Sequence, residues 1–122
     1  MKSIIPNLFI DNCRENLEFY KNIFNGELNN IVPRFDAEDK IMHAELHINK
    51  DCVLYFGDKL EEAAPDPNIH IFLKFEAEAE IEKVYDLLKK EGQVEIELNQ
   101  SFWGTIHAVI IDKNGITWDL DK

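Results

Sequence analysis

The sequence predicts an α+β fold of two βαβββ modules, and two observations lead to that prediction. Residues 3–56 read as a strand, an amphipathic helix and three short strands, and the same order returns from about residue 69 to the end. Neither module can cover its own apolar sheet face, so the two half-sheets should pack side by side as one cup-shaped mixed sheet. We expect a single domain over residues 1–122, with module one at about 1–57, a linker at 58–68 and module two at about 69–122.

The first module begins with a nearly all-apolar strand at residues 4–10. Asn12, followed three residues later by Glu15, resembles a capping box, so a helix should begin at this point. Gly26 should end the helix in a left-handed conformation. The apolar stripe expected on this helix consists of Cys13, Leu17, Tyr20 and Phe24.

Three strands should follow in this module, at residues 31–32, 42–48 and 52–56. The middle strand alternates strictly between apolar and polar side chains, so its two faces should differ. Met42, Ala44, Leu46 and Ile48 should point one way, and His43, Glu45 and His47 the other.

The second module repeats the pattern, with a strand at residues 69–75 and a helix that ends at Gly92. Glutamates at 76, 78, 80 and 82 suit the N-terminal end of a helix dipole. The apolar stripe of this helix should be Ile81, Val84, Tyr85 and Leu88. Further strands are expected at residues 94–98, 105–111 and 116–120, with a tight turn at residues 114–115.

Composition and charge exclude several classes of protein. The net charge of −11 repels phosphate backbones and anionic membranes, so neither nucleic acid nor a membrane is an expected partner. No apolar run approaches the roughly 18 residues that a membrane span needs. The N-terminus lacks the pattern of a secretory signal, so a cytoplasmic location is expected. Cys13 and Cys52 should then stay reduced.

His43, Glu45 and His47 form a His-x-Glu-x-His pattern along one strand face. Side chains two apart on a strand lie about 6.6 Å from each other, so long ones can converge on one ion. Imidazole and carboxylate ligands suit zinc or a similar transition metal, which makes the three residues weak metal candidates or an acid–base cluster. The favoured interpretation is a solvated strand face, because alternation is typical of half-buried strands.

Four residues of the second module are candidates for a binding pocket. His107 would either line the pocket as an acid–base group or be a hydrogen-bonded, partly buried residue. Asp119 would either stand on an inner face or be exposed near the C-terminus. Phe102 and Trp103 precede a glycine in a loop, where aromatic side chains contact a ligand, a partner subunit or the core.

Three segments of the chain together resemble one superfamily. They read IIPNLFIDNCRENLEFYKNIF, KIMHAELHINKDCVLYFGD and SFWGTIHAVIIDKNGITWDL. In their order and spacing they resemble the vicinal oxygen chelate superfamily of glyoxalases, bleomycin-resistance proteins and extradiol dioxygenases, and within it the PhnB-like proteins. His107 and Ile106 depart from the PhnB-like pattern, in which a tyrosine and an arginine are usual.

The resemblance implies the same cup-shaped sheet of two βαβββ modules, commonly in a homodimer. It also implies a place for a divalent metal, held by four side chains from the first and last strands of each module. The mapped positions are Ile5 and Tyr55 in the first module and, in the second, Phe72 or Leu73 (His70 only after a further register slip) and Asp119. Neither Ile5 nor Tyr55 is a good ligand, whereas Asp119 is chemically suitable. The resemblance therefore implies that at least two of the four metal positions lack a suitable ligand.

These observations predict a small-molecule-binding protein without the complete metal site. The pocket residues would be Phe102, Trp103, His107, Asp119, Tyr55 and His43. The alternatives are a divalent-metal-dependent lyase, isomerase or dioxygenase, with the metal on His43, Glu45, His47 or Asp119, and a structural dimer whose cup its own side chains fill. No phosphate-cradling glycine loop, Ser-His-Asp set or zinc-type cysteine pair is recognisable in the sequence, so no residue is assigned as catalytic.

Overall fold

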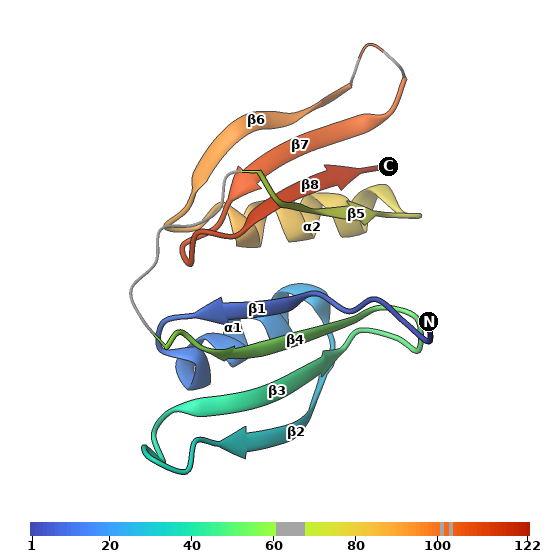
Figure 1. Ribbon diagram of the computed structural model, residues 1–122. Helices are drawn as coiled ribbons and strands as arrows, with labels where there is room; N and C mark the ends of the chain where they lie inside the picture. The colour runs from blue at the N-terminus through green and yellow to red at the C-terminus, as the bar shows by residue number, and fades with distance from the viewer. Residues whose placement is uncertain (61–67, 101, 103) are drawn as a thin grey trace. The chain divides into compact units, whose positions relative to one another are not determined.

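The computed structural model describes residues 1–60, 68–100, 102 and 104–122. The chain divides into two compact units, residues 1–63 and 64–122, and each unit is one βαβββ module (Figure 1). Each module has its own mixed four-stranded sheet, which confirms the predicted α+β fold. The joining of the two sheets into a cup stays a prediction.

The first module contains β1 (Asn7–Ile10), α1 (Cys13–Phe24), β2 (Glu27–Pro33), β3 (Ile41–His47) and β4 (Val53–Asp58). Its strand order is β1-β4-β3-β2, with β1 parallel to β4 and the other neighbours antiparallel. Along the chain, α1 follows β1 and forms part of the long connection that the parallel pairing of β1 with β4 requires. β2 is longer than the sequence predicted, since it begins directly after the helix cap.

The second module contains β5 (His70–Lys74), α2 (Glu78–Leu88), β6 (Gln93–Gln100), β7 (Ile106–Ile111) and β8 (Thr117–Asp121). Its strand order, β5-β8-β7-β6, and its pairing directions repeat those of the first module. The two modules therefore present equivalent faces, one toward their helix and one away from it.

Each helix covers one face of its own sheet (Figure 1). On α1 the buried stripe is Cys13, Leu17, Tyr20 and Ile23, so Ile23 takes the place predicted for Phe24. Tyr20 stacks on Phe56 of β4 with ring centroids 4.9 Å apart. On α2 the buried stripe is Ile81, Val84 and Leu88, while the predicted fourth member, Tyr85, stays partly exposed.

The start of α1 differs from the predicted capping box. Asn12 is left-handed, with φ 50°, and its side chain makes no capping hydrogen bond. Instead, Asp58 Oδ1 accepts a hydrogen bond from the Cys13 N–H at 3.1 Å, and Asp58 Oδ2 accepts one from the Ile41 N–H at 2.6 Å. Asp58 is buried and belongs to β4, so the strand extends one residue into the predicted linker.

Each helix is followed by a glycine, but the left-handed residue is the one before that glycine. Asn25 has φ 51° ahead of Gly26, and Glu91 has φ 58° ahead of Gly92. A Cβ on Gly26 would lie 2.7 Å from the Leu46 side chain, and one on Gly92 would lie 2.5 Å from the backbone oxygen of Ile111. The glycines are thus required by the close approach of β3 and β7, and the predicted left-handed cap at Gly26 is wrong.

The alternation predicted for β3 fails at its first residues. Ile41 is fully buried and Met42 is 55 % exposed, the reverse of the expected orientation. The pairing with β2 shifts register between Val32 and Pro33, so one residue is inserted at this end of the strand. From His43 onward the alternation holds, with Ala44 and Leu46 toward the helix.

Within the described residues, neither α1 nor α2 is long and apolar enough to cross a membrane.

Candidate functional site

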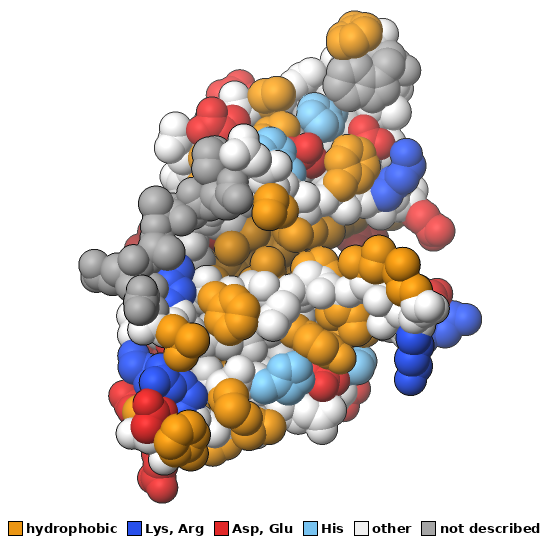
Figure 2. All heavy atoms as spheres, in the orientation of Figure 1, with side chains coloured by type: hydrophobic (Ala, Val, Ile, Leu, Met, Phe, Trp, Pro, Cys, Tyr) orange, Lys and Arg blue, Asp and Glu red, His pale blue; other side chains and the backbone are white. Residues whose placement is uncertain are grey.

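Side chains on the helix-free side of the second sheet form rows that run across all four strands. The strand pairing places Asn99, His107, Asp121 and Lys74 in one row, and Ile96, Val109, Asp119 and Phe72 in the next. These eight residues and His70, which follows on β5, are called the module-two face. On the sides of the units that face the viewer in Figure 2, histidine side chains lie beside acidic and apolar ones.

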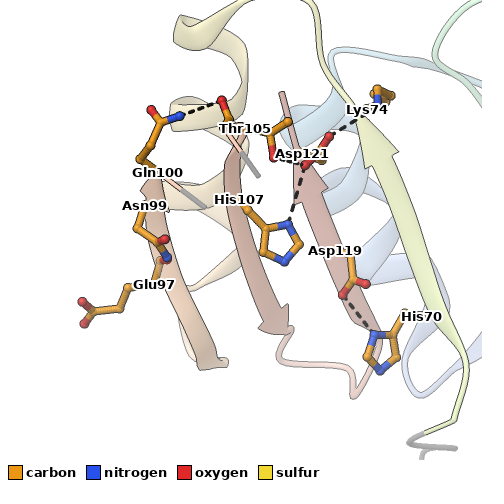
Figure 3. A network of polar contacts seen from close by, with 10 residues as sticks. His70, Lys74, Glu97, Asn99, Gln100, Thr105, His107, Asp119 and Asp121 are labelled. Carbon is orange, nitrogen blue, oxygen red and sulfur yellow. Dashed lines mark hydrogen bonds and ion pairs between the residues drawn. The ribbon is translucent and has the colours of Figure 1, made fainter. Parts of the chain in front are cut away.

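Asp121 is the centre of the polar row (Figure 3). Its Oδ1 accepts a hydrogen bond from Thr105 Oγ1 at 2.8 Å and lies 3.8 Å from His107 Nδ1, while its Oδ2 lies 3.5 Å from Lys74 Nζ. The hydrogen bond from Thr105, followed by the nearby Lys74 ammonium, lowers the pKa of Asp121 below its ordinary value. This nearly buried side chain is therefore a carboxylate at neutral pH.

His70 and Asp119 form a second histidine–aspartate pair on the same face. His70 Nδ1 lies 3.0 Å from Asp119 Oδ1, and the two residues come from the neighbouring strands β5 and β8 (Figure 3). A carboxylate at Nδ1 favours the tautomer in which that nitrogen carries the proton. The ring then presents its Nε2 as a hydrogen-bond acceptor.

The corresponding face of module one carries the predicted cluster on β3. His43 Nε2 lies 3.0 Å from Glu45 Oε2, and His47 Nε2 lies 2.8 Å from Glu45 Oε1. Hydrogen bonds from the two imidazoles, His43 first, together with Asn30 lower the pKa of Glu45 to about 2. The His43 ring also packs edge to face on the Tyr55 ring, with the ring centroids 4.7 Å apart. The structure therefore brings together four of the residues singled out in the sequence.

The repeat of the fold identifies which residues of the two modules correspond. Tyr55 pairs with Asn7, and Asp119 pairs with Phe72, each at the same point of its last strand. Two residues before those partners stand Ile5 and His70. The residue that matches Ile5 in the second module is therefore His70, and not Phe72 or Leu73 as the sequence mapping had it.

The four positions at which the superfamily would hold a metal do not fit one here. Ile5 has no donor atom, the Tyr55 phenol is a poor ligand, and His70 and Asp119 are bonded to each other. The His43, Glu45 and His47 cluster does not replace them, because the two imidazoles bond opposite oxygens of one carboxylate. Among the described residues, no three His, Cys, Asp or Glu side chains are arranged so that they could hold a metal ion.

Of the remaining predicted pocket residues, the structure describes Phe102 and His107. Phe102 is 97 % exposed, and Trp103 lies outside the described residues. His107 is half-buried on β7. Sequence reasoning missed Asp121 as a site residue and considered His70 only as a metal position after a further register slip. Alternation along β8 puts Asp119 and Asp121 on the same side of the sheet, so the signal for Asp121 was present in the sequence.

The buried thiol of module one takes no part in either face. Cys13 lies on α1 toward the sheet, and burial, followed by the nearby Asp58 carboxylate, raises its pKa to about 12. A thiol with such a pKa is not a nucleophile at neutral pH.

Residues 5–120 match the family model described as "Glyoxalase/Bleomycin resistance protein/Dioxygenase superfamily". No curated protein matches the chain. Among solved structures, the chain is similar to protein PA1353 from Pseudomonas aeruginosa, with a TM-score of 0.87 and 26 % identity over 99 % of this chain and 97 % of that one.

Two further structures show the same fold at lower identity. The PhnB protein from Bacillus cereus has a TM-score of 0.84 and 22 % identity, covering 98 % of both chains. The fosfomycin resistance protein FosX from Listeria monocytogenes, solved with Mn(II) and 1S,2S-dihydroxypropylphosphonic acid, has a TM-score of 0.72 and 13 % identity over 98 % of this chain and 91 % of that one.

Proposed function

Because the chain belongs to the glyoxalase, bleomycin resistance protein and dioxygenase superfamily, we propose that it is a PhnB-like protein that binds a small molecule without the superfamily's four-ligand metal centre. One observation carries this proposal. The metal positions of module one are Ile5 and Tyr55, while those of module two, His70 and Asp119, bond to each other.

The module-two face supplies most of the contacts that such a ligand would use. His107 and Asp119 are its predicted polar contacts, and we add His70 and Asp121, which lie beside them on the same face. Hydrogen-bonding groups held by fixed neighbours bind with little loss of side-chain freedom, which favours specific recognition. The sequence also assigned Tyr55, His43, Phe102 and Trp103 to the pocket, and that assignment stays a prediction.

The location and assembly of the protein belong to the same proposal. We expect a cytoplasmic protein whose partners are its ligand and a second copy of the chain. The net charge of −11 disfavours nucleic acid and anionic membranes as partners. Sedimentation velocity under reducing conditions tests the dimer, because a single species of one-chain mass would contradict it.

Metal loading is the experiment that separates this proposal from a metal-dependent enzyme. Untagged protein is dialysed against Mn²⁺, Ni²⁺ or Zn²⁺, and the bound metal is measured by elemental analysis. We expect well below one ion per chain, for the wild type and for Asp119→Ala, His43→Ala and the control Asp86→Ala alike. One ion per chain that is lost in Asp119→Ala or His43→Ala, but kept in Asp86→Ala, would instead establish the metal-dependent alternative.

Ligand binding is tested directly with a fragment library that includes neutral, cationic and anionic members. Two-dimensional NMR of ¹⁵N-labelled protein locates each fragment from the backbone amides that shift. We expect binders whose effects centre on β5, β7 and β8 rather than on α2. A library without a single binder would contradict the proposed function.

A further inference from the structure

One row of the module-two face combines exposed apolar side chains with one carboxylate. This row consists of Ile96, Val109, Asp119 and Phe72. Phe72 is 56 % exposed and Ile96 is 45 % exposed, although both are large apolar residues on strands. Asp119 lies in the same row, between Phe72 on β5 and Val109 on β7. An apolar ligand body laid along this row would remove Phe72 and Ile96 from water, which is favourable.

Asp119 offers an acceptor next to this apolar surface. Its Oδ1 lies 3.0 Å from His70 Nδ1, and within the described part of the chain no hydrogen bond reaches its Oδ2. A ligand hydroxyl or amino group placed over Phe72 could therefore donate to Asp119. Charge-assisted hydrogen bonds of this kind are stronger than those between neutral groups.

The two carboxylates of the module-two face, Asp121 and Asp119, are not compensated equally. Lys74 Nζ lies 3.5 Å from Asp121 Oδ2 and so compensates that carboxylate, whereas the described partner of Asp119 is an imidazole. The chain as a whole carries a net charge of −11. Both the local carboxylate and the overall field disfavour a ligand with negative charge at this point.

We propose that the module-two face selects neutral or cationic small molecules that carry an apolar ring beside a hydroxyl or amino group, and that Asp119 rejects anionic molecules of the same shape. This inference rests on the proposed function, to which it adds the class of ligand. It sets the chain apart from FosX, whose structure contains a phosphonic acid.

Three probes of similar size test the selection: 2-phenylethylamine, 2-phenylethanol and phenylacetate. Each is titrated into ¹⁵N-labelled protein, and dissociation constants are fitted to the amide shifts of β5 and β8. We expect the amine and the alcohol to bind and phenylacetate to bind about tenfold more weakly or not at all, as expected for one close carboxylate.

Two variants assign the preference to one side chain. Asp119→Asn should weaken the binding of 2-phenylethylamine by about tenfold and remove most of the discrimination against phenylacetate. Asp86→Asn removes the same charge from α2, away from the face, and should change each constant by less than about twofold. The wild-type comparison of the three probes needs no variant, so a folding defect in Asp119→Asn would leave the test intact.

The outcomes separate this inference from the proposed function. Phenylacetate binding as tightly as the amine, or an Asp119→Asn variant that keeps the full preference, would overturn the inference and leave small-molecule binding in place. Binding that maps only to module one would do the same. The three probes could also show no binding while library fragments bind the module-two face. In that case the charge of the bound fragments tests the inference: neutral or cationic fragments support it, and anionic fragments overturn it. A library without any binder overturns both.

Discussion

Asp58 holds the backbone of Cys13, a residue 45 positions earlier in the chain, through a 3.1 Å hydrogen bond at the start of α1. The other oxygen of the same carboxylate holds the Ile41 N–H at the start of β3. One side chain at the end of β4 therefore joins a helix and a strand that the sequence keeps far apart. The structure uses this long-range contact where the sequence suggested a local cap.

Replacing Asp58 with alanine should strongly destabilise module one. The change leaves two buried N–H groups without their acceptor, at about 1–3 kcal/mol for each unsatisfied group. We therefore expect the free energy of unfolding to fall by about 3 kcal/mol, measured by urea denaturation with circular dichroism. Asp51→Ala, at an exposed turn, is the matched control. A loss no greater than that of the control would show that the helix start does not depend on Asp58.

Replacing Trp118 with phenylalanine should destabilise module two. Trp118 is fully buried, and its Nε1 donates a 2.8 Å hydrogen bond to Asp112 Oδ2. Phenylalanine removes this donor and leaves a cavity, so we expect a loss of about 2–4 kcal/mol in urea denaturation. A double-mutant cycle with Asp112→Asn separates the hydrogen bond from the packing. Full additivity in that cycle would mean that the hydrogen bond contributes nothing.

The cluster on β3 should make stability depend on acid pH. Glu45 has a pKa of about 2 in the folded chain against an ordinary value of 4.5, so its contribution is present above pH 4.5 and is lost as the pH falls toward 2. We expect the difference in melting temperature between the wild type and Glu45→Gln to shrink across this interval. Glu82→Gln on α2, used as a control, should show no such trend. A difference that stayed constant down to pH 2 would rule out the predicted linkage.

The hydroxyl of Thr105 should set the ionisation of Asp121. Its hydrogen bond is the largest of the effects that lower the pKa of this carboxyl, so Thr105→Val should raise that pKa toward its ordinary value. Carboxyl ¹³C chemical shifts followed by NMR during a pH titration measure the change. Thr117→Val, at the other end of β8, keeps the Thr105 bond and should leave the titration of Asp121 unchanged.

The fold could be predicted from local pattern, because each helix stripe and each strand alternation reflects burial against one sheet face. Cys13, Leu17 and Tyr20 were placed correctly for this reason. Errors arose where distant parts of the chain determine the local structure. Asp58 replaces the Asn12 cap, and a register shift against β2 turns Met42 outward.

The candidate site could be predicted only in part. For Asp119 the sequence left two alternatives, an inner face or exposure near the C-terminus, and alternation placed only the His43, Glu45 and His47 face. It could not reveal that His70 meets Asp119, because their side chains come from strands 49 residues apart. The correspondence between Ile5 and His70 likewise depends on the register of β1 against β4 and of β5 against β8. The residues next to Ile5 and His70 in the sequence do not determine that register.

The contrast between the two cysteines bears on how any association of chains should be measured. Cys13 is enclosed, and its high pKa protects it from oxidants, whereas Cys52 stands exposed at the β3–β4 turn. In air, two copies could become covalently linked through Cys52 alone and imitate a native dimer. Samples of a Cys52→Ser variant would show whether pairing survives once that artefact has been removed.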